Sequence, residues 1–263
     1  MPIDCNQTFH FNNLTPVAIG AIGGSGSRLV AQLLIDVGFF MGHTLNRSND
    51  NLTYTDHFKR MESLDWPSAK LDEQLFSFIN ATTVDAAGRS YLASRWGWKE
   101  PNTHILIDRL LKRMPLLRYI HVVRNGLDMA HSKNQNQPKL WGAHFLGHPA
   151  AIPVSPRYAL KYWCAVHRRM ENIAQIPEFG KRIFFLDYDQ LCRHPKPSII
   201  RLLNFIDVQV DEALANLLSQ KVSPPPSLGR WLIDGEAAFD QEDFVYANNF
   251  AERAATLGWS QRV

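Results

Sequence analysis

Residues 17–30, VAIGAIGGSGSRLV, carry the pattern that decides the fold class. The apolar run at 17–22 predicts a buried strand, residues 23–27 predict a turn, and an amphipathic helix is expected from Arg28 to about Val37. A strand that leads through a glycine-serine loop into a helix commonly binds phosphate, because the loop N–H groups and the positive end of the helix dipole attract anions. The stretch therefore predicts an anion site in an α/β fold.

The loop differs from three familiar glycine motifs. A nucleoside-triphosphatase loop, G-x-x-x-x-G-K-[ST], is excluded because Ala21 stands five residues before Gly26 and no lysine follows it. A nucleophile elbow, G-x-S-x-G, is excluded because Ser27 stands two residues after Ser25. A dinucleotide fingerprint lacks its third glycine, since Leu29 stands there. The loop therefore predicts an anion but indicates no particular nucleotide, and a glycine-rich turn without a ligand is the alternative.

The composition is that of an ordinary globular chain of 263 residues, 45% hydrophobic and 20% charged. Its net charge of +3 favours an anionic ligand but does not indicate nucleic-acid binding. Cys5, Cys164 and Cys192 lack metal-ligand spacing, so we expect reduced cysteines and no metal site. The N-terminus does not resemble a signal peptide, and no apolar run approaches the roughly 20 residues of a membrane span. We therefore expect a cytoplasmic protein without nucleic-acid or membrane partners.

A second informative stretch is 116–132, LLRYIHVVRNGLDMAHS. Residues 117–123 predict a buried strand, Arg124 follows at its carboxyl end, and Ser132 comes eight residues later, after a turn and the start of a helix. Ligands of open parallel sheets bind at the carboxyl ends of strands, so we expect Arg124 and the loop at 23–27 at the same edge. The planar fork of arginine suits a phosphate. The alternative is an ordinary salt-bridge arginine.

Two further regions carry candidate catalytic side chains. In residues 95–101, RWGWKEP, Lys99 is expected at the end of a short strand facing an anion, and the alternative is aromatic packing with a surface charge pair. Residues 43–65 are polar and predict either solvated surface or the wall of an acceptor pocket. Four side chains there are candidates for a general base, with surface or capping roles as the alternative for each: His43, Asp50, Asp56 and His57.

The whole chain, residues 1–263, is predicted to form one domain. We expect residues 1–15 to be a loose arm. Residues 133–156, rich in glycine and proline, predict a long loop that serves as a lid or acceptor wall. Apolar periodicity predicts a strand at 181–187 and helices at 71–79, 103–113, 157–176, 197–206, 211–221 and 240–257. We also expect an extended segment at 223–231.

Together these motifs resemble those of the sulfotransferases that use 3′-phosphoadenosine-5′-phosphosulfate (PAPS), over residues 17–231. The glycine-serine loop lies on the family's 5′-phosphosulfate motif. Arg124 and Ser132 match the spacing of its 3′-phosphate motif. Tyr188, in LDYDQLCRHP, resembles the tyrosine beside the adenine, and Lys99 in WKEP resembles the lysine that faces the sulfuryl group in the bacterial and tyrosylprotein branches.

The resemblance implies a set of site residues. Gly229-Arg230-Trp231 resembles a basic element that the family has late in the chain, near the 3′-phosphate. The implied cofactor-binding residues are Gly23, Gly24, Ser25, Gly26, Ser27, Arg28, Arg124, Ser132, Tyr188 and Arg230. The candidate catalytic residues are Lys99, Arg28, Asp50, Asp56 and His57. One position departs from the family, because Gly24 stands where a lysine or arginine is usual, and Arg28 or Lys99 is expected to supply the missing cation.

The resemblance also implies a P-loop-like α/β fold of three layers, with a central mainly parallel sheet flanked by helices. The implied reaction is in-line transfer of the sulfuryl group from PAPS to a hydroxyl of a carbohydrate or small-molecule acceptor, with the desulfated nucleotide PAP as product and no metal. Two alternatives stay open: a protein that binds PAPS or PAP without turnover, and a P-loop-like small-molecule kinase, against which the missing Walker lysine argues.

Overall fold

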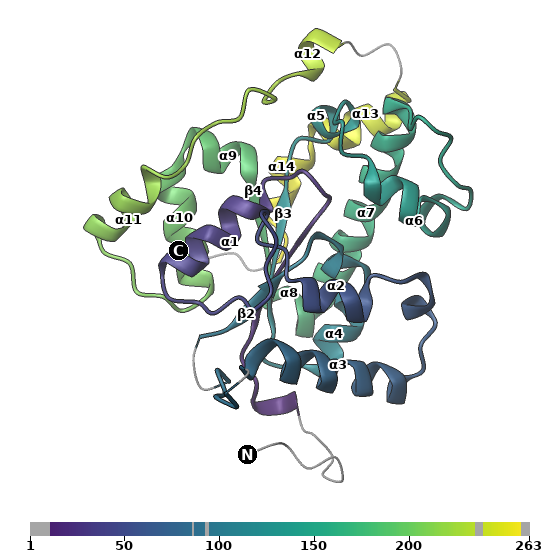
Figure 1. Cartoon of the computed structure of the whole chain (residues 1–263). Helices are drawn as coiled ribbons and strands as arrows, with labels where there is room; N and C mark the ends of the chain where they lie inside the picture. The colour runs from purple at the N-terminus through teal and green to yellow at the C-terminus, as the bar shows by residue number, and fades with distance from the viewer. Residues whose placement is uncertain (1–10, 86, 93–94, 235–238, 259–263) are drawn as a thin grey trace. The chain divides into compact units, whose positions relative to one another are not determined.

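The computed structural model describes residues 11–85, 87–92, 95–234 and 239–258 (Figure 1). Most of the expected N-terminal arm lies outside these residues. The chain divides into two compact units, one made of Met1–Gly20 and Ser27–Tyr119 and the other of Ala21–Gly26 and Ile120–Val263. The glycine-serine loop therefore belongs mainly to the second unit, although the helix that follows it belongs to the first.

A four-stranded sheet has the order β2-β1-β3-β4. Its strands are β1 (Val17–Ala21), β2 (Gly97–Lys99), β3 (Arg118–Val123) and β4 (Ile183–Asp187). β1 and β2 are parallel, with Ile19 opposite Lys99. Every residue of β1 and β2 is buried, as expected for strands with both faces covered. The predicted α/β fold with a mainly parallel sheet flanked by helices is confirmed.

The first unit surrounds β2 with aromatic side chains. The Trp98 ring lies 5.3 Å from Phe78 and 5.9 Å from Tyr54, centroid to centroid, and its indole N–H donates to Thr103 at 3.2 Å. This packing fixes β2 against the helices that carry those rings. The helical elements of this unit are η1 (Phe11–Asn13), α1 (Ser27–Asp36), α2 (Leu52–Phe58), η2 (Met61–Leu64), α3 (Ser68–Thr83), η3 (Pro101–Ile105) and α4 (Ile107–Arg113).

In the second unit, helices pack against both faces of β4. Phe184 packs against Phe205 with ring centroids 5.3 Å apart, and the next residue, Phe185, lies 6.2 Å from Phe250 on the opposite face. Such alternation follows from the two-residue period of a strand. The helices of this unit are α5 (Gly126–Ala130), α6 (Asn136–Leu146), α7 (Pro156–Ala174), α8 (Pro177–Gly180), α9 (Tyr188–Arg193), α10 (Pro195–Phe205), α11 (Glu212–Ser219), α12 (Trp231–Asp234), α13 (Gln241–Asn248) and α14 (Phe250–Ala254).

The prediction of a long loop at 133–156 is wrong, because α6 forms within it. Pro138 lies in the first turn of α6, where proline is tolerated, and Gly147 ends the helix in the left-handed conformation with φ of 77°. The same residue types that suggested a loop thus mark the two ends of a helix. Trp141 supplies the buried face.

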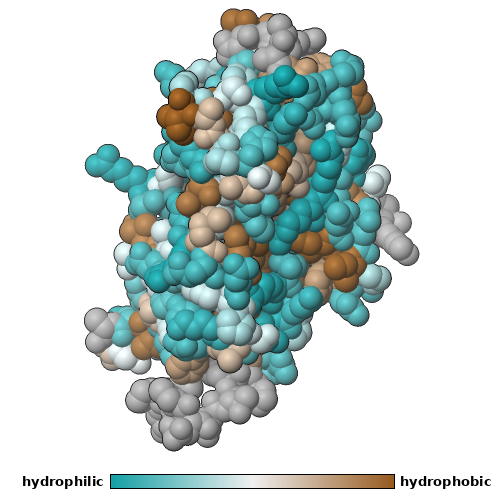
Figure 2. Space-filling model, turned by 90° about the vertical axis from the view of Figure 1, so that its right-hand side faces the viewer, coloured by the Kyte–Doolittle hydropathy of each residue, from teal (hydrophilic) through white to brown (hydrophobic). Residues whose placement is uncertain are grey.

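Three other boundaries differ from the sequence prediction. The helix expected at 103–113 starts as the 3-10 turn η3 and continues as α4, and the helix expected at 240–257 is interrupted at Asn249 between α13 and α14. The helix that follows Arg124 ends at Ala130, so Ser132 lies beyond it. None of the described helices is long and apolar enough to cross a membrane. The face seen in Figure 2 is mostly hydrophilic, with hydrophobic residues scattered over it.

Candidate functional site

The glycine-serine loop has a left-handed backbone at two glycines, and one of them is packed so closely that no side chain fits. Gly24 and Gly26 have φ of +97° and +86°, values that glycine adopts without steric cost. A Cβ on Gly26 would lie 2.1 Å from the ring of Tyr188. The Ser25 hydroxyl, 1% exposed, donates back to the Ile22 carbonyl at 2.6 Å. Tyr188 therefore packs directly on a preorganised loop.

Arg124, at the carboxyl end of β3, is buried beside this loop. Its Nη1 donates to the Gly24 carbonyl at 3.3 Å, and its Nη2 donates to the carbonyl and hydroxyl of Ser227 at 2.8 and 2.9 Å. The guanidinium carbon lies 5.9 Å from the centroid of the Tyr188 ring. Its Nε has no hydrogen-bond partner among the described residues, although the side chain is only 4% exposed. A buried cation with an unused donor is suited to an anion.

The backbone after Arg124 is held by an acidic residue. Asp189 accepts a hydrogen bond from the Asn125 N–H at 2.7 Å, and burial raises the pKa of Asp189. The side-chain oxygen of Asn125 accepts from the N–H groups of Leu127 and Asp128 and so begins α5. Arg124 is thus fixed by the strand before it and by these bonds after it.

Ser132 also lies beside the loop. Its hydroxyl accepts from the Asn134 N–H at 3.2 Å, and a Cβ on Gly24 would be 3.6 Å from that hydroxyl. A Cβ on Gly23 would be 3.3 Å from the Asn134 amide nitrogen. The structure therefore brings the predicted residues Gly23, Gly24, Gly26, Arg124, Ser132 and Tyr188 together in one cluster, which we call the loop–arginine cluster.

Segment 223–231 reaches the same cluster through Ser227. Arg230, predicted from the resemblance, donates to the His131 carbonyl at 3.4 Å. Asp128 of α5 accepts hydrogen bonds from the N–H groups of Gly229 at 2.7 Å and Trp231 at 3.1 Å. Sequence reasoning missed Ser227 and Asp128, because their partners lie about 100 residues away along the chain.

A separate cluster in the first unit contains Lys99. This lysine is 2% exposed and forms an ion pair with Asp50, and its Nζ donates to the Ser48 carbonyl at 3.0 Å. The second carboxylate oxygen of Asp50 accepts from the Asn46 side chain at 2.9 Å. The Asn46 side-chain oxygen accepts from the N–H groups of Ser48 and Asp50. We call these four residues the lysine–aspartate cluster.

The connection between Lys99 and the polar stretch runs through Asn51. Its backbone N–H donates to the Lys99 carbonyl at 2.7 Å, and its side chain both caps α2 and donates to the Met41 carbonyl at 3.0 Å. Asn51 is fully buried. The start of α2 is therefore anchored at the end of β2, which places Asp50 beside Lys99.

The other base candidates have different surroundings. His57 is hydrogen-bonded to the Gln74 side chain at 2.9 Å, whereas Asp56 is exposed on α2 and His43 is exposed before it. Of the four candidates, Asp50 is the one whose ion pair with Lys99 is observed. Arg28 is exposed in the first turn of α1, directly after the buried Ser27.

A buried carboxylate that sequence reasoning passed over is Glu100. It is 3% exposed, accepts from the backbone and side-chain N–H groups of Asn102 at 2.5 and 2.8 Å, and lies 4.0 Å from Lys59. Burial raises the pKa of Glu100. Its hydrogen bonds begin η3, which indicates a role in the structure.

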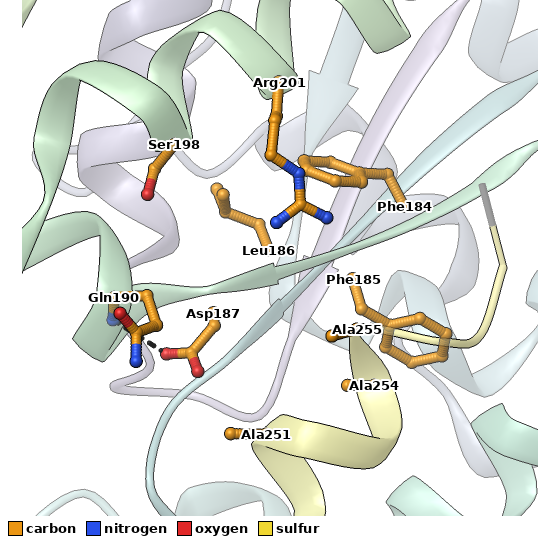
Figure 3. Close-up of a pocket in the computed structure, with 10 residues that line it drawn as sticks. All are labelled: Phe184, Phe185, Leu186, Asp187, Gln190, Ser198, Arg201, Ala251, Ala254 and Ala255. Carbon is orange, nitrogen blue, oxygen red and sulfur yellow. Dashed lines mark hydrogen bonds between the residues drawn. The ribbon is translucent and has the colours of Figure 1, made fainter. Parts of the chain in front are cut away.

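A pocket of about 80 Å³ opens elsewhere in the second unit, between β4, α10 and α14 (Figure 3). Phe184, Leu186 and alanines of α14 line it, and its arginine, Arg201, stacks 5.7 Å over the Phe184 ring. None of the predicted site residues lines this pocket. Within the described part of the chain, no cluster of three or more histidine, cysteine, aspartate or glutamate residues is placed to hold a metal.

The sequence matches the model of a protein family described as the sulfotransferase family over residues 16–212. Among solved structures, it is similar to the sulfotransferase domain of the Synechococcus PCC 7002 olefin synthase, at 16% identity and a TM-score of 0.56, covering 93% of this chain and 98% of that one. It is also similar to the sulfotransferase domain of the curacin biosynthetic pathway, at 13% identity and a TM-score of 0.55, covering 91% and 98%. At these identities the two likenesses show the fold. No curated protein matches the sequence.

Proposed function

Because the chain belongs to the sulfotransferase family, an enzyme family that uses PAPS, we propose that it transfers the sulfuryl group of PAPS to a hydroxyl of a carbohydrate or small-molecule acceptor. The observation that carries this proposal is the buried Arg124, whose Nε has no partner among the described residues, beside the carbonyl of Gly24. A phosphate oxygen would complete that guanidinium. PAP is the expected nucleotide product.

We assign the two phosphate groups of the nucleotide to different parts of the loop–arginine cluster. The N–H groups of the glycine-serine loop and Ser27 bind the 5′-phosphosulfate, because a glycine backbone allows close approach to an anion. Arg124, Ser132 and Arg230 bind the 3′-phosphate. Tyr188, which packs on Gly26 and faces the Arg124 guanidinium, contacts the adenine side.

The lysine–aspartate cluster supplies the transfer chemistry in this proposal. The acceptor oxygen attacks sulfur, the bond from sulfur to the bridging oxygen of the 5′-phosphate breaks, and PAP leaves. Asp50 takes the proton of the acceptor hydroxyl, because its carboxylate is oriented by both Lys99 and Asn46. Lys99 stabilises the charge on the sulfuryl oxygens, as fixed cations do in a site with little water.

The family's usual loop cation is absent at Gly24, and we assign its task to Lys99 or Arg28. Lys99 is buried and already neutralises a carboxylate, whereas Arg28 is exposed at the start of α1. An exposed guanidinium is free to follow the leaving phosphate. Loss of turnover with retained PAP binding in Arg28→Ala would assign the task to Arg28.

The proposal is tested by turnover with ³⁵S-labelled PAPS over a panel of sugar, phenol and alkyl alcohol acceptors. Calorimetry with PAP runs beside it, using the wild-type chain, Arg124→Ala and the control Arg89→Ala, whose side chain is 75% exposed. We expect Arg124→Ala to weaken PAP binding by about 100-fold, since it removes a charged partner of a phosphate, and Arg89→Ala to leave it unchanged. Unchanged PAP affinity in Arg124→Ala would overturn the nucleotide assignment, and binding without transfer to any acceptor would leave a PAPS-binding protein.

A further inference from the structure

Residues 223–231, SPPPSLGRW, form a segment that we call the proline strap. Three consecutive prolines restrict its backbone, and Gly229 turns it with φ of +75°. Ser227 accepts a hydrogen bond from Arg124, and Arg230 donates one to the carbonyl of His131. The strap is therefore joined to the nucleotide region of the second unit at more than one point.

Asp128 makes a further attachment to the strap. Asp128 is 1% exposed, and each of its carboxylate oxygens accepts a backbone hydrogen bond from the strap, one from Gly229 and one from Trp231. An ionised carboxylate is costly to bury without such partners. A buried negative charge would also oppose an anion bound nearby. The two bonds to the strap are the contacts that offset this cost.

The two donors flank one residue. Gly229 and Trp231 stand on either side of Arg230, so the backbone of Arg230 is fixed from both directions. We propose that Asp128 is a positioning residue for the 3′-phosphate of the nucleotide, acting through the strap by orienting Arg230. The inference rests on the proposed function, because it assumes that a nucleotide with a 3′-phosphate binds here.

The position of Ser227 fits this role. Arg124 donates hydrogen bonds from Nη2 to Ser227 and from Nη1 to the Gly24 carbonyl. Its Nε therefore stays available to donate to a phosphate oxygen of the nucleotide. The strap therefore does not have to release Arg124 when the nucleotide binds. Asp128 thus keeps the strap in the arrangement that a 3′-phosphate requires before that phosphate arrives, which lowers the ordering cost of binding.

Calorimetry with PAP and with AMP, which lacks the 3′-phosphate, tests the inference. The variants are Asp128→Asn, which keeps the shape and one acceptor oxygen, and Asp128→Ala. We expect the affinity for PAP to fall by about 10-fold in Asp128→Asn and further in Asp128→Ala, with AMP affinity within about 2-fold of wild type. The matched control is Glu171→Gln, which removes another buried carboxylate of the second unit, one that holds Arg253 and Tyr246. We expect this control to leave the ratio of PAP to AMP affinity unchanged.

Equal losses of PAP and AMP affinity, or an unchanged PAP affinity, would overturn the inference. Hydrogen exchange separates its failure from that of the proposed function. The amides of Gly229 and Trp231 should be protected in the wild type and exchange at least 10-fold faster in Asp128→Asn. If the wild type binds no PAP but the amides respond in this way, the strap attachment holds and the nucleotide assignment fails. Unchanged amide exchange overturns the strap attachment itself.

Discussion

The loop–arginine cluster and the lysine–aspartate cluster are built in different ways. The first is made of left-handed glycines, a buried guanidinium and a tyrosine ring that fills the space against Gly26. The second is an ion pair whose carboxylate is 21% exposed and is oriented by an exposed asparagine, Asn46. A cluster packed this tightly suits a constant ligand, such as a nucleotide, whereas a polar loop can vary with the acceptor. With the roles that we propose for the two clusters, the difference predicts that donor binding and acceptor chemistry can be disturbed separately.

The largest effect is expected from Lys99→Met, which keeps the length of the side chain and removes its charge. If Lys99 has its proposed role, the substitution removes a fixed cation that stabilises transition-state charge. We then expect kcat to fall by about 100- to 1000-fold, with little change in PAP affinity. Steady-state turnover and PAP calorimetry measure the two effects. Lys70→Met, at an exposed pair with Glu73, is the control and should behave as wild type. A parallel fall in PAP affinity would show that the lysine–aspartate cluster also contributes to nucleotide binding, so that binding and transfer are not separate.

The second effect concerns Gly26 and donor binding. Gly26→Ala introduces a Cβ that overlaps the Tyr188 ring at a φ of +86°, so we expect PAP affinity to fall by about 30-fold. Gly38→Ala is the matched control, because φ there is +88° and no atom lies within 4 Å of the added Cβ. It should reduce stability by about 1 kcal/mol and leave PAP affinity unchanged. Equal PAP affinities for the two variants would mean that the packing of Tyr188 on the loop is irrelevant to binding.

These clusters differ in how far the sequence predicts them. A strand, loop and helix are continuous in the chain, and the rule for carboxyl ends of parallel strands predicted Arg124 beside the loop. Partners that meet only after folding, such as Asp128 with Gly229, leave no local pattern. Loop-forming residues were also ambiguous, since Gly147 ends a helix instead of belonging to a long loop. The sequence thus predicted the fold and the residues at strand ends, but not the contacts that orient them.

A smaller effect tests how Asp50 is oriented. Asn46→Ala removes the hydrogen bond to one carboxylate oxygen of Asp50 and two bonds that shape the loop before it. We expect kcat to fall by about 10-fold, because the carboxylate of Asp50 is less well oriented, with PAP affinity unchanged. Ser48→Ala is the control, because Ser48 contacts Lys99 through its carbonyl. An unchanged kcat in Asn46→Ala would argue against Asp50 as the base.

The smallest effect on turnover is expected from Glu100→Gln, and it decides between two neighbouring carboxylates. Glu100 follows Lys99 directly, yet its oxygens are occupied by Asn102, so we expect kcat within about 2-fold of wild type. A fall of 100-fold or more would transfer the role of base from Asp50 to Glu100.

The substitution Glu100→Gln should also change how the free energy of unfolding depends on pH. Burial raises the pKa of Glu100 above its ordinary value of 4.5, so the folded chain holds this proton at pH values where the unfolded chain has lost it. The resulting stabilisation is present on the acid side and is lost as the pH rises from 4.5 through the folded pKa. Urea unfolding of the wild type should show this decline, and Glu100→Gln, which cannot ionise, should flatten it. The opposite result would be a free energy of unfolding that rises with pH above 4.5 in the wild type but not in Glu100→Gln. It would mean that Glu100 is charged and well paired in the folded chain. Glu100 would then be available as a base, which would weaken the distinction between the two clusters.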